Sequence, residues 1–242
     1  MTALEPLLFG SLRGHPAAIP FAEQVVRVHR RFAVEVVAAH RLCPFVKDPD
    51  VAFGRFCVGL TERTDLDEAR DVFVRAGNPV LHIVYPLIRG PAGDFERFGG
   101  DVGRAARDVW RALPAGDGRY GPEPPVIATF HPGLAGERTS PHRMIGLLRR
   151  SPDPFVQIIP GGHHESGTVV APITDITALT PEMIAKLLAI QPPPPKDRIH
   201  ETFARMTPAL FDEIAATIAD IMADRDRSYA PLLLELRASQ PG

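Results

Sequence analysis

Proline and glycine residues divide this chain into short segments along most of its length. The 242 residues include 26 prolines and 20 glycines, which form no repeat. Proline ends a helix and lacks a backbone donor for a sheet, so these residues are expected to mark the ends of structural elements. The pattern therefore predicts a folded protein with many firmly bounded elements, and not a low-complexity tail.

The remaining composition excludes several classes of protein. The chain is 45% hydrophobic and 23% charged, which are ordinary globular values and rule out a disordered chain. Two cysteines are too few for a disulfide scaffold, and no apolar stretch approaches the ~20 residues that span a bilayer. A formal net charge of −2 gives no general attraction to nucleic acid or to an anionic membrane. Because the first residues lack a basic region ahead of an apolar core, we expect a cytoplasmic protein.

Hydrophobic periodicity predicts alternating helices and strands. Helices are expected over residues 22–42, 66–76, 95–113, 140–149 and 181–190, and strands over 55–60, 79–88, 126–130, 155–159 and 168–173. This order suits an α+β or α/β sandwich in which helices pack on a sheet of about four to five strands.

The four prolines at 192–195 separate two parts of the chain, because such a run forms a stiff spacer. The parts are an α+β core domain at residues 21–190 and a C-terminal helical extension at 196–242. In the extension, a helix beginning after Thr207 carries an apolar stripe formed by Leu210, Ile214, Ile218 and Ile221. The stripe either docks on the main body or forms the seam of a homodimer.

Cys43 is the first residue with candidate chemistry, because it stands where a helix is expected to end. Pro44 disfavours a helical conformation at Cys43, which places the sulfur near the carboxyl end of the helix. The partial negative charge there disfavours a thiolate nucleophile and favours a metal ion. His40 precedes Cys43 by three residues on the same helix face, so the pair could begin a metal site. The alternative is a small buried thiol at a helix-to-loop corner.

His131 is the second candidate. It follows the apolar strand expected at 126–130 and precedes Pro132 and Gly133, which places its side chain at the carboxyl edge of the sheet. That position suits a general base or a metal ligand. The alternative is a histidine that only bonds a loop carbonyl.

Arg150 and Ser151 form the third candidate, at a rigid proline-rich loop. A guanidinium and a hydroxyl together could grip a carboxylate or a phosphate. Arginines in a last helical turn can equally satisfy terminal carbonyls. The cluster is too small for a nucleic-acid groove and lacks interleaved aromatic residues.

Three motifs occur in a fixed order along the chain. They are Leu-Cys-Pro-Phe at 42–45, Phe-His-Pro at 130–132 and Arg-Ser-Pro-Asp-Pro at 150–154. Together they resemble the bacterial domain-of-unknown-function family 1415 over about residues 22–159. The resemblance implies a soluble bacterial protein of unassigned role, with an α+β, ferredoxin-like sandwich; we expect its helices on one face of the sheet. The residues that match by position are Cys43, His131, Arg150 and Ser151.

Two departures from the family pattern bear on a site. Family members commonly have an asparagine ahead of Leu-Cys, where this chain has Arg41, and a histidine in the last strand, where it has Gln157. If that strand histidine belongs to a shared site, this protein has altered it.

The leading hypothesis is an enzyme that acts on a small polar or anionic substrate. Cys43 and His131 would form its site, with Arg150 and Ser151 gripping the anion. One alternative is a metal-binding module in which His40, Cys43 and His131 hold a divalent metal such as zinc, iron or copper. Another is a non-catalytic interaction protein that dimerises through its C-terminal helix. The expected partner is a small-molecule substrate, with no nucleic acid, no membrane and a homodimer as an open alternative.

Overall fold

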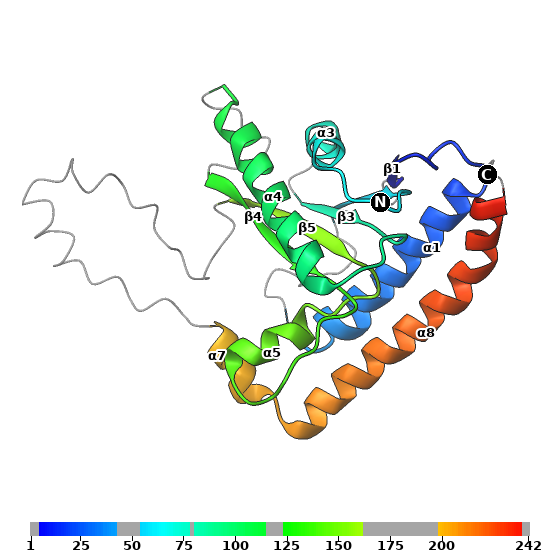
Figure 1. Ribbon diagram of the computed structural model, residues 1–242. Helices are drawn as coiled ribbons and strands as arrows, with labels where there is room; N and C mark the ends of the chain where they lie inside the picture. The colour runs from blue at the N-terminus through cyan, green and yellow to red at the C-terminus, as the bar shows by residue number, and fades with distance from the viewer. Residues whose placement is uncertain (1–4, 43–53, 78–79, 115–122, 162–197, 239–242) are drawn as a thin grey trace, which may run out of the picture.

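A computed structural model of the chain describes residues 5–42, 54–77, 80–114, 123–161 and 198–238 (Figure 1). It is an α+β structure with a mixed, open sheet of five strands, as the sequence predicts. Cys43, the strand expected at 168–173 and the helix expected at 181–190 lie outside the described residues. In the described ranges, no helix is both long enough and apolar enough to cross a membrane.

The sheet combines a parallel and an antiparallel part. Its strands are β1 (Leu7–Phe9), β2 (Arg55–Gly59), β3 (Leu81–Val84), β4 (Glu123–Phe130) and β5 (Phe155–Gly161). Their order is β1-β2-β3-β5-β4. Strands β1, β2 and β3 are parallel, and β5 runs antiparallel to both of its neighbours.

The helices lie between successive strands and, after β5, in the C-terminal part of the chain. They are α1 (Ala18–Arg31), the π-helix η1 (Phe32–Ala38), α3 (Leu66–Ala76), α4 (Ala92–Arg111), α5 (Pro141–Leu148), α7 (Arg198–Arg205) and α8 (Pro208–Ala238). Helix α3 has the predicted bounds, because the Asp65 side chain accepts from the Glu68 backbone N–H and Gly77 ends the helix with φ 56°.

Helices cover both faces of the sheet, so the expectation of helices on one face is wrong. Figure 1 shows α3 and α4 on one side and α1 and α8 on the other. Phe56 and Val58 of β2 join the core beneath α1 and α8, whereas Cys57 joins the core beneath α3 and α4. A strand that is apolar on both sides needs cover on both sides. The two covered faces and the three parallel strands also distinguish this sheet from the two-layer ferredoxin-like sandwich that was expected.

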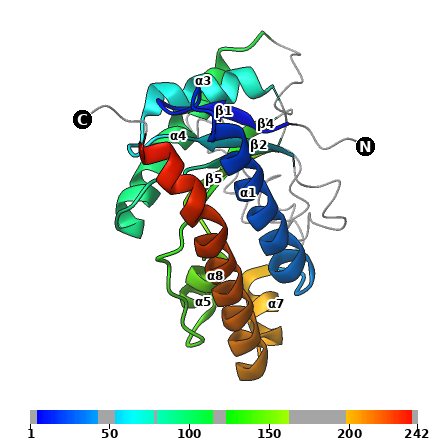
Figure 2. The same cartoon turned by 90° about the vertical axis from the view of Figure 1, so that its right-hand side faces the viewer.

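The C-terminal helix α8 docks on the main body beside α1 (Figure 2). Ile214, Ile218 and Ile221 are fully buried in the core that α1 also lines. Arg27 and Arg31 of α1 bind Asp224 of α8 with N–O distances of 2.8 and 2.7 Å. The predicted stripe therefore faces the body, and a homodimer, which stays a prediction, would need another surface.

The segment that leads toward Cys43 departs from a regular helix. A single helix was expected over residues 22–42, but α1 begins at Ala18 and continues as η1, with Val36 buried against the core. Arg41 then adopts a φ of 51°, in the left-handed region that ends the helical path. Asparagine tolerates that region better than arginine does, which gives a physical reason for the residue that the family resemblance places there.

Candidate functional site

A row of four rings crosses the sheet on the face beneath α1 and α8, and three of its members are phenylalanines. Phe130 of β4 stacks on Phe155 of β5 with 4.2 Å between ring centroids. His82 of β3 lies 5.6 Å from Phe155 and 5.0 Å from Phe56 of β2. Alternate residues of a strand point to the same face, which is why the row crosses four strands, with a diagonal step from His82 to Phe155, whose register partner is Val84.

His82 is the polar member of this row, and it is partly exposed. Burial of the imidazole among the rings, followed by a smaller effect of the nearby His29, lowers its pKa to about 3. The imidazole is therefore neutral at neutral pH, with one nitrogen as a donor and the other as an acceptor. Gln157 of β5 is the register partner of His82 and is also partly exposed. Position 157 is where the family resemblance expects a histidine, so that histidine would lie beside His82.

A buried polar network lies next to the ring row. Asp153 accepts a hydrogen bond from the Tyr229 hydroxyl at 2.8 Å, and its Oδ2 lies 3.2 Å from His29 Nε2. Asp153 is fully buried, Tyr229 is 2% exposed and His29 is 3% exposed. His29 meets the row edge-on, with its ring centroid 5.3 Å from that of Phe155. Burial and the Asp153 carboxylate raise the pKa of Tyr229, so this hydroxyl keeps its proton and donates it.

The loop that carries Asp153 is held from several sides. The Ser151 hydroxyl donates to the Asp153 carbonyl at 2.6 Å, and Tyr85 N–H donates to the Pro154 carbonyl at 2.8 Å. Arg225 of α8 donates to the Pro152 carbonyl. Ser151 is fully buried, so its hydroxyl serves this loop, whereas the sequence predicted that it grips an anion.

One carboxylate oxygen of this network lacks a partner. Asp153 Oδ1 is buried and forms no hydrogen bond in the structure. An unsatisfied buried acceptor costs free energy, and such groups are rare in the interior of a protein. Together with the lowered pKa of His82, it distinguishes this region as the strongest candidate site in the described chain.

His131 lies on the opposite side of the sheet, where its ring centroid is 5.9 Å from that of Phe95 of α4. Its Nδ1 accepts a hydrogen bond from Gly133 N–H at 2.9 Å, which places the proton of the neutral ring on Nε2. Burial lowers the pKa of His131 and favours this neutral form. The sequence offered the alternative that His131 only forms a hydrogen bond with its own loop. Such a bond is present, but its partner is the backbone N–H of Gly133 and not a carbonyl. In this state neither ring nitrogen offers a free lone pair for a metal ion.

The other predicted site residues are not brought together in the described ranges. Arg150 is partly buried and its Nε has no hydrogen-bond partner, while His40 is partly exposed in the turn after η1. Within the described part of the chain, no three histidine, cysteine, aspartate or glutamate side chains form a group that could hold a metal ion. The Cys43–His131 site and the metal site stay predictions, because Cys43 is outside these ranges.

Sequence reasoning missed four residues of the candidate site: His29, His82, Asp153 and Tyr229. A local signal existed for two of them. His29 falls on the buried face of an amphipathic helix, and His82 interrupts an apolar strand. Asp153 and Tyr229 are separated by 76 residues, and no spacing rule connects them.

No family model, curated protein or solved structure matches this chain. The resemblance to family 1415 accordingly stays a prediction, based on the three motifs alone.

Proposed function

We propose that this protein is an enzyme that acts on a small polar substrate at the sheet face formed by His82, Gln157 and the ring row. The observation that supports the proposal best is a neutral, partly exposed histidine beside a buried His–Asp–Tyr network. Neutral imidazoles and amide side chains form directional hydrogen bonds, and flat apolar rings exclude water from the bonded groups. This combination orients a substrate that carries hydroxyl, carbonyl or amide groups.

The chemical role of His82 follows from its pKa. A group with a pKa of about 3 holds a proton poorly at neutral pH, so His82 would not store one between steps. A neutral imidazole can instead donate its N–H to a carbonyl oxygen and polarise the bond. The reaction class that suits this site is therefore addition of a nucleophile to a polarised carbonyl, with Cys43 as the candidate nucleophile.

The buried network would keep the site in position. Asp153 receives the Tyr229 hydroxyl and lies within bonding distance of His29, whose ring contacts the row edge-on. Roles for Cys43 as a ligand or nucleophile, and for Arg150 as the group that binds an anion, remain part of the proposal. Leu42, which immediately precedes Cys43, packs against the same core as the row.

Substrate depletion from a mixture of small metabolites, followed by mass spectrometry, tests the proposal. Purified wild-type protein is expected to consume at least one carbonyl compound, and His82→Phe is expected to abolish its consumption while preserving the ring row. His142→Phe, at a histidine on α5 outside this face, serves as the matched control. Depletion by His82→Phe at the wild-type rate, or no depletion by wild type, would contradict the proposal.

A further inference from the structure

A polar crevice of about 900 Å³ opens where β1 and β2 end. One side is formed by the residues that follow β1, and the other by the residues that follow β2 together with the outer face of α3. The lining residues used below are Arg13, Arg63, Asp67 and Asp71. This volume falls within the range of small-molecule sites.

The topology explains why a crevice forms there. The chain leaves β1 for α1, on one face of the sheet, and leaves β2 for α3, on the other. Because neighbouring parallel strands send their chains to opposite faces, the two loops separate at the carboxyl edge, and ligands bind in such crevices in open α/β sheets. Both crossovers run in the same direction along the sheet, so one of them has the rare left-handed sense.

The walls of the crevice are fixed by hydrogen bonds. Gly10 N–H donates to Glu68 Oε1 at 2.8 Å, which ties the loop after β1 to α3. Gly10 has a φ of 93°, and a Cβ there would lie 2.6 Å from the Leu60 carbonyl oxygen, so only glycine fits. Leu12 N–H also donates to that carbonyl at 3.1 Å. These contacts therefore hold the walls of the crevice in place before a ligand binds.

Two arginines and two aspartates of the crevice carry opposite charges without forming ion pairs, although Arg13 also donates a hydrogen bond to the Gly10 carbonyl at 3.3 Å. Arg13 and Arg63 come from the two loops, while Asp67 and Asp71 share one face of α3 at a spacing of four residues. Within the described ranges, no ion pair joins either arginine to either aspartate. Closed ion pairs elsewhere, such as Arg31 with Asp224, show that the chain forms them where geometry allows. A ligand that carries both charges could bridge the two walls.

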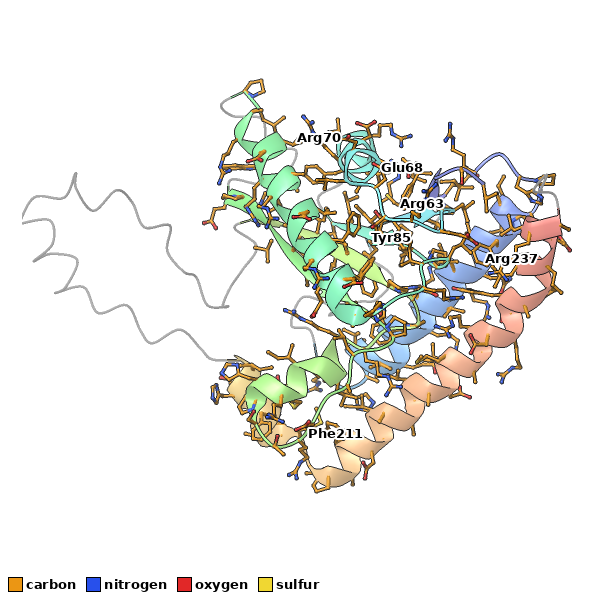
Figure 3. The ribbon with its side chains drawn as sticks, viewed as in Figure 1. Arg63, Glu68, Arg70, Tyr85, Phe211 and Arg237 are labelled. Carbon is orange, nitrogen blue, oxygen red and sulfur yellow. The ribbon has the colours of Figure 1, made fainter. Side chains whose placement is uncertain are left out.

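A buried hydroxyl lies beneath the same crevice. Tyr85 is 1% exposed, and its hydroxyl has no hydrogen-bond partner. Its ring packs 5.5 Å from that of Phe9, a lining residue, and Figure 3 shows it in the region of Glu68 and Arg63. Burial raises the pKa of Tyr85, and the charge of Glu68 raises it further, so the hydroxyl keeps its proton and remains a donor.

We propose that this crevice binds a small zwitterion, with its anionic group on Arg13 and Arg63 and its ammonium group on Asp67 and Asp71. Guanidinium groups recognise carboxylates and phosphates alike, so the anion is either of these. The crevice is separate from the sheet face of His82, which lies beneath α1 and α8. It therefore adds a binding site that does not depend on the proposed function.

Isothermal titration calorimetry of the full chain tests this site with three zwitterionic probes: β-alanine, 5-aminovalerate and O-phosphoethanolamine. At least one is expected to bind, and to bind about tenfold more tightly than inorganic phosphate, acetate or ethanolamine, which each carry one of the two charges. Arg63→Ala and Asp71→Ala are each expected to weaken binding about tenfold, because each removes one charged contact.

Arg70→Ala is the matched control, since Arg70 is an exposed residue of α3 that does not line the crevice (Figure 3). Its affinity should stay within about twofold of wild type. All these positions are exposed, so each variant is expected to fold, and circular dichroism checks this. The proposal is overturned if no zwitterion binds, if a singly charged probe binds equally well, or if Arg70→Ala weakens binding as much as Arg63→Ala.

Discussion

The two faces of the sheet differ in what they bury. The face beneath α1 and α8, called the first face below, buries His29, Asp153 and the Tyr229 hydroxyl in one hydrogen-bonded network. Beneath α3 and α4, it consists mainly of aliphatic and aromatic side chains packed around Tyr85 and Phe95. Burying a charged or polar group costs free energy unless it is paired, so a core gains most from apolar packing alone. The face that buries the Asp153 carboxyl group is the one that the proposed function uses.

The face of the sheet beneath α3 and α4, called the second face below, is stabilised mainly by close packing. Gly99 of α4 is buried directly against Thr129 of β4, so the helix backbone lies close to the strand. The thiol of Cys57 is buried in the same core, and burial raises its pKa to about 12. Such a thiol is inert at neutral pH, which fits a structural role. The following predictions are ordered from the largest expected effect to the smallest.

Asp153→Ala should cost the most free energy of unfolding. The change leaves His29 Nε2 and the Tyr229 hydroxyl without their shared acceptor in a buried site, at an expected cost of about 4 kcal/mol. Urea unfolding followed by circular dichroism measures it. Asp212→Ala, at an exposed position of α8, should change stability by less than about 0.5 kcal/mol. If the two substitutions lower the free energy of unfolding equally, the buried network does not stabilise the first face.

His82→Phe should flatten the dependence of stability on pH in acid. The folded pKa of His82 is lowered to about 3, below the unfolded value of about 6.5, so the unfolded chain binds an extra proton between these limits. Wild-type stability should therefore fall as pH drops, by about 2 kcal/mol from about pH 6 to about pH 4.5, on account of this residue.

His82→Phe keeps a ring in the row and removes the titrating group. Its free energy of unfolding should lack that share of the decrease, as measured by urea titrations across the same pH interval. A decrease as steep as in wild type would mean that His82 titrates normally, and the main argument for the neutral imidazole would be lost.

Gly99→Ala probes the close packing of the second face. An added Cβ would overlap Thr129 of β4, so we expect a loss of about 2 kcal/mol in thermal or urea unfolding. Gly100→Ala changes the neighbouring, exposed residue, where the nearest atom to the new Cβ is Arg104 Nη1 at 3.9 Å. That change should stabilise α4 by about 0.5–1 kcal/mol. The prediction fails if both substitutions shift stability in the same direction.

Asp224→Asn tests the ion pairs that hold α8 on the first face. Hydrogen bonds from Arg27, and then from Arg31, hold the pKa of Asp224 well below its ordinary value of about 4. A lowered carboxylate pKa contributes stability above the unfolded pKa, and that contribution is lost as pH falls through the folded value. The substitution should cost about 1 kcal/mol at neutral pH, since the pair is partly solvated. At about pH 2 the difference from wild type should shrink, and a constant difference would contradict this account.

Elements bounded by local signals could be predicted well from the sequence. Helix α3 has the predicted bounds because an N-cap aspartate and a C-terminal glycine are local signals. Helix α5 lies within the predicted range 140–149 because Ser140 caps it and Pro141 stands at its first position. The three-residue strand β1 was not predicted, because only its pairing with β2 defines it. The strand expected at 168–173 and the helix expected at 181–190 lie outside the described ranges.

The candidate site could be predicted only in part. The sequence predicts a rigid proline-rich loop at 150–154, and hydrogen bonds from the Ser151 hydroxyl and from Arg225 hold this loop in the structure. The residue that matters chemically there is Asp153, however, and its partners lie 124 and 76 residues away along the chain. Sequence periodicity reports which face of an element is apolar, but not which distant polar group meets it.

The sequence by itself determined the α+β class, the principal helices and strands, and the apolar stripe of the C-terminal helix, because these depend on residue spacing and end signals within short segments. Only the tertiary structure decided that helices cover both faces, that α8 completes a buried network with α1, and that His82 lies in a row of rings. These features depend on contacts between residues far apart in the chain, whose formation is governed by the packing of the whole core.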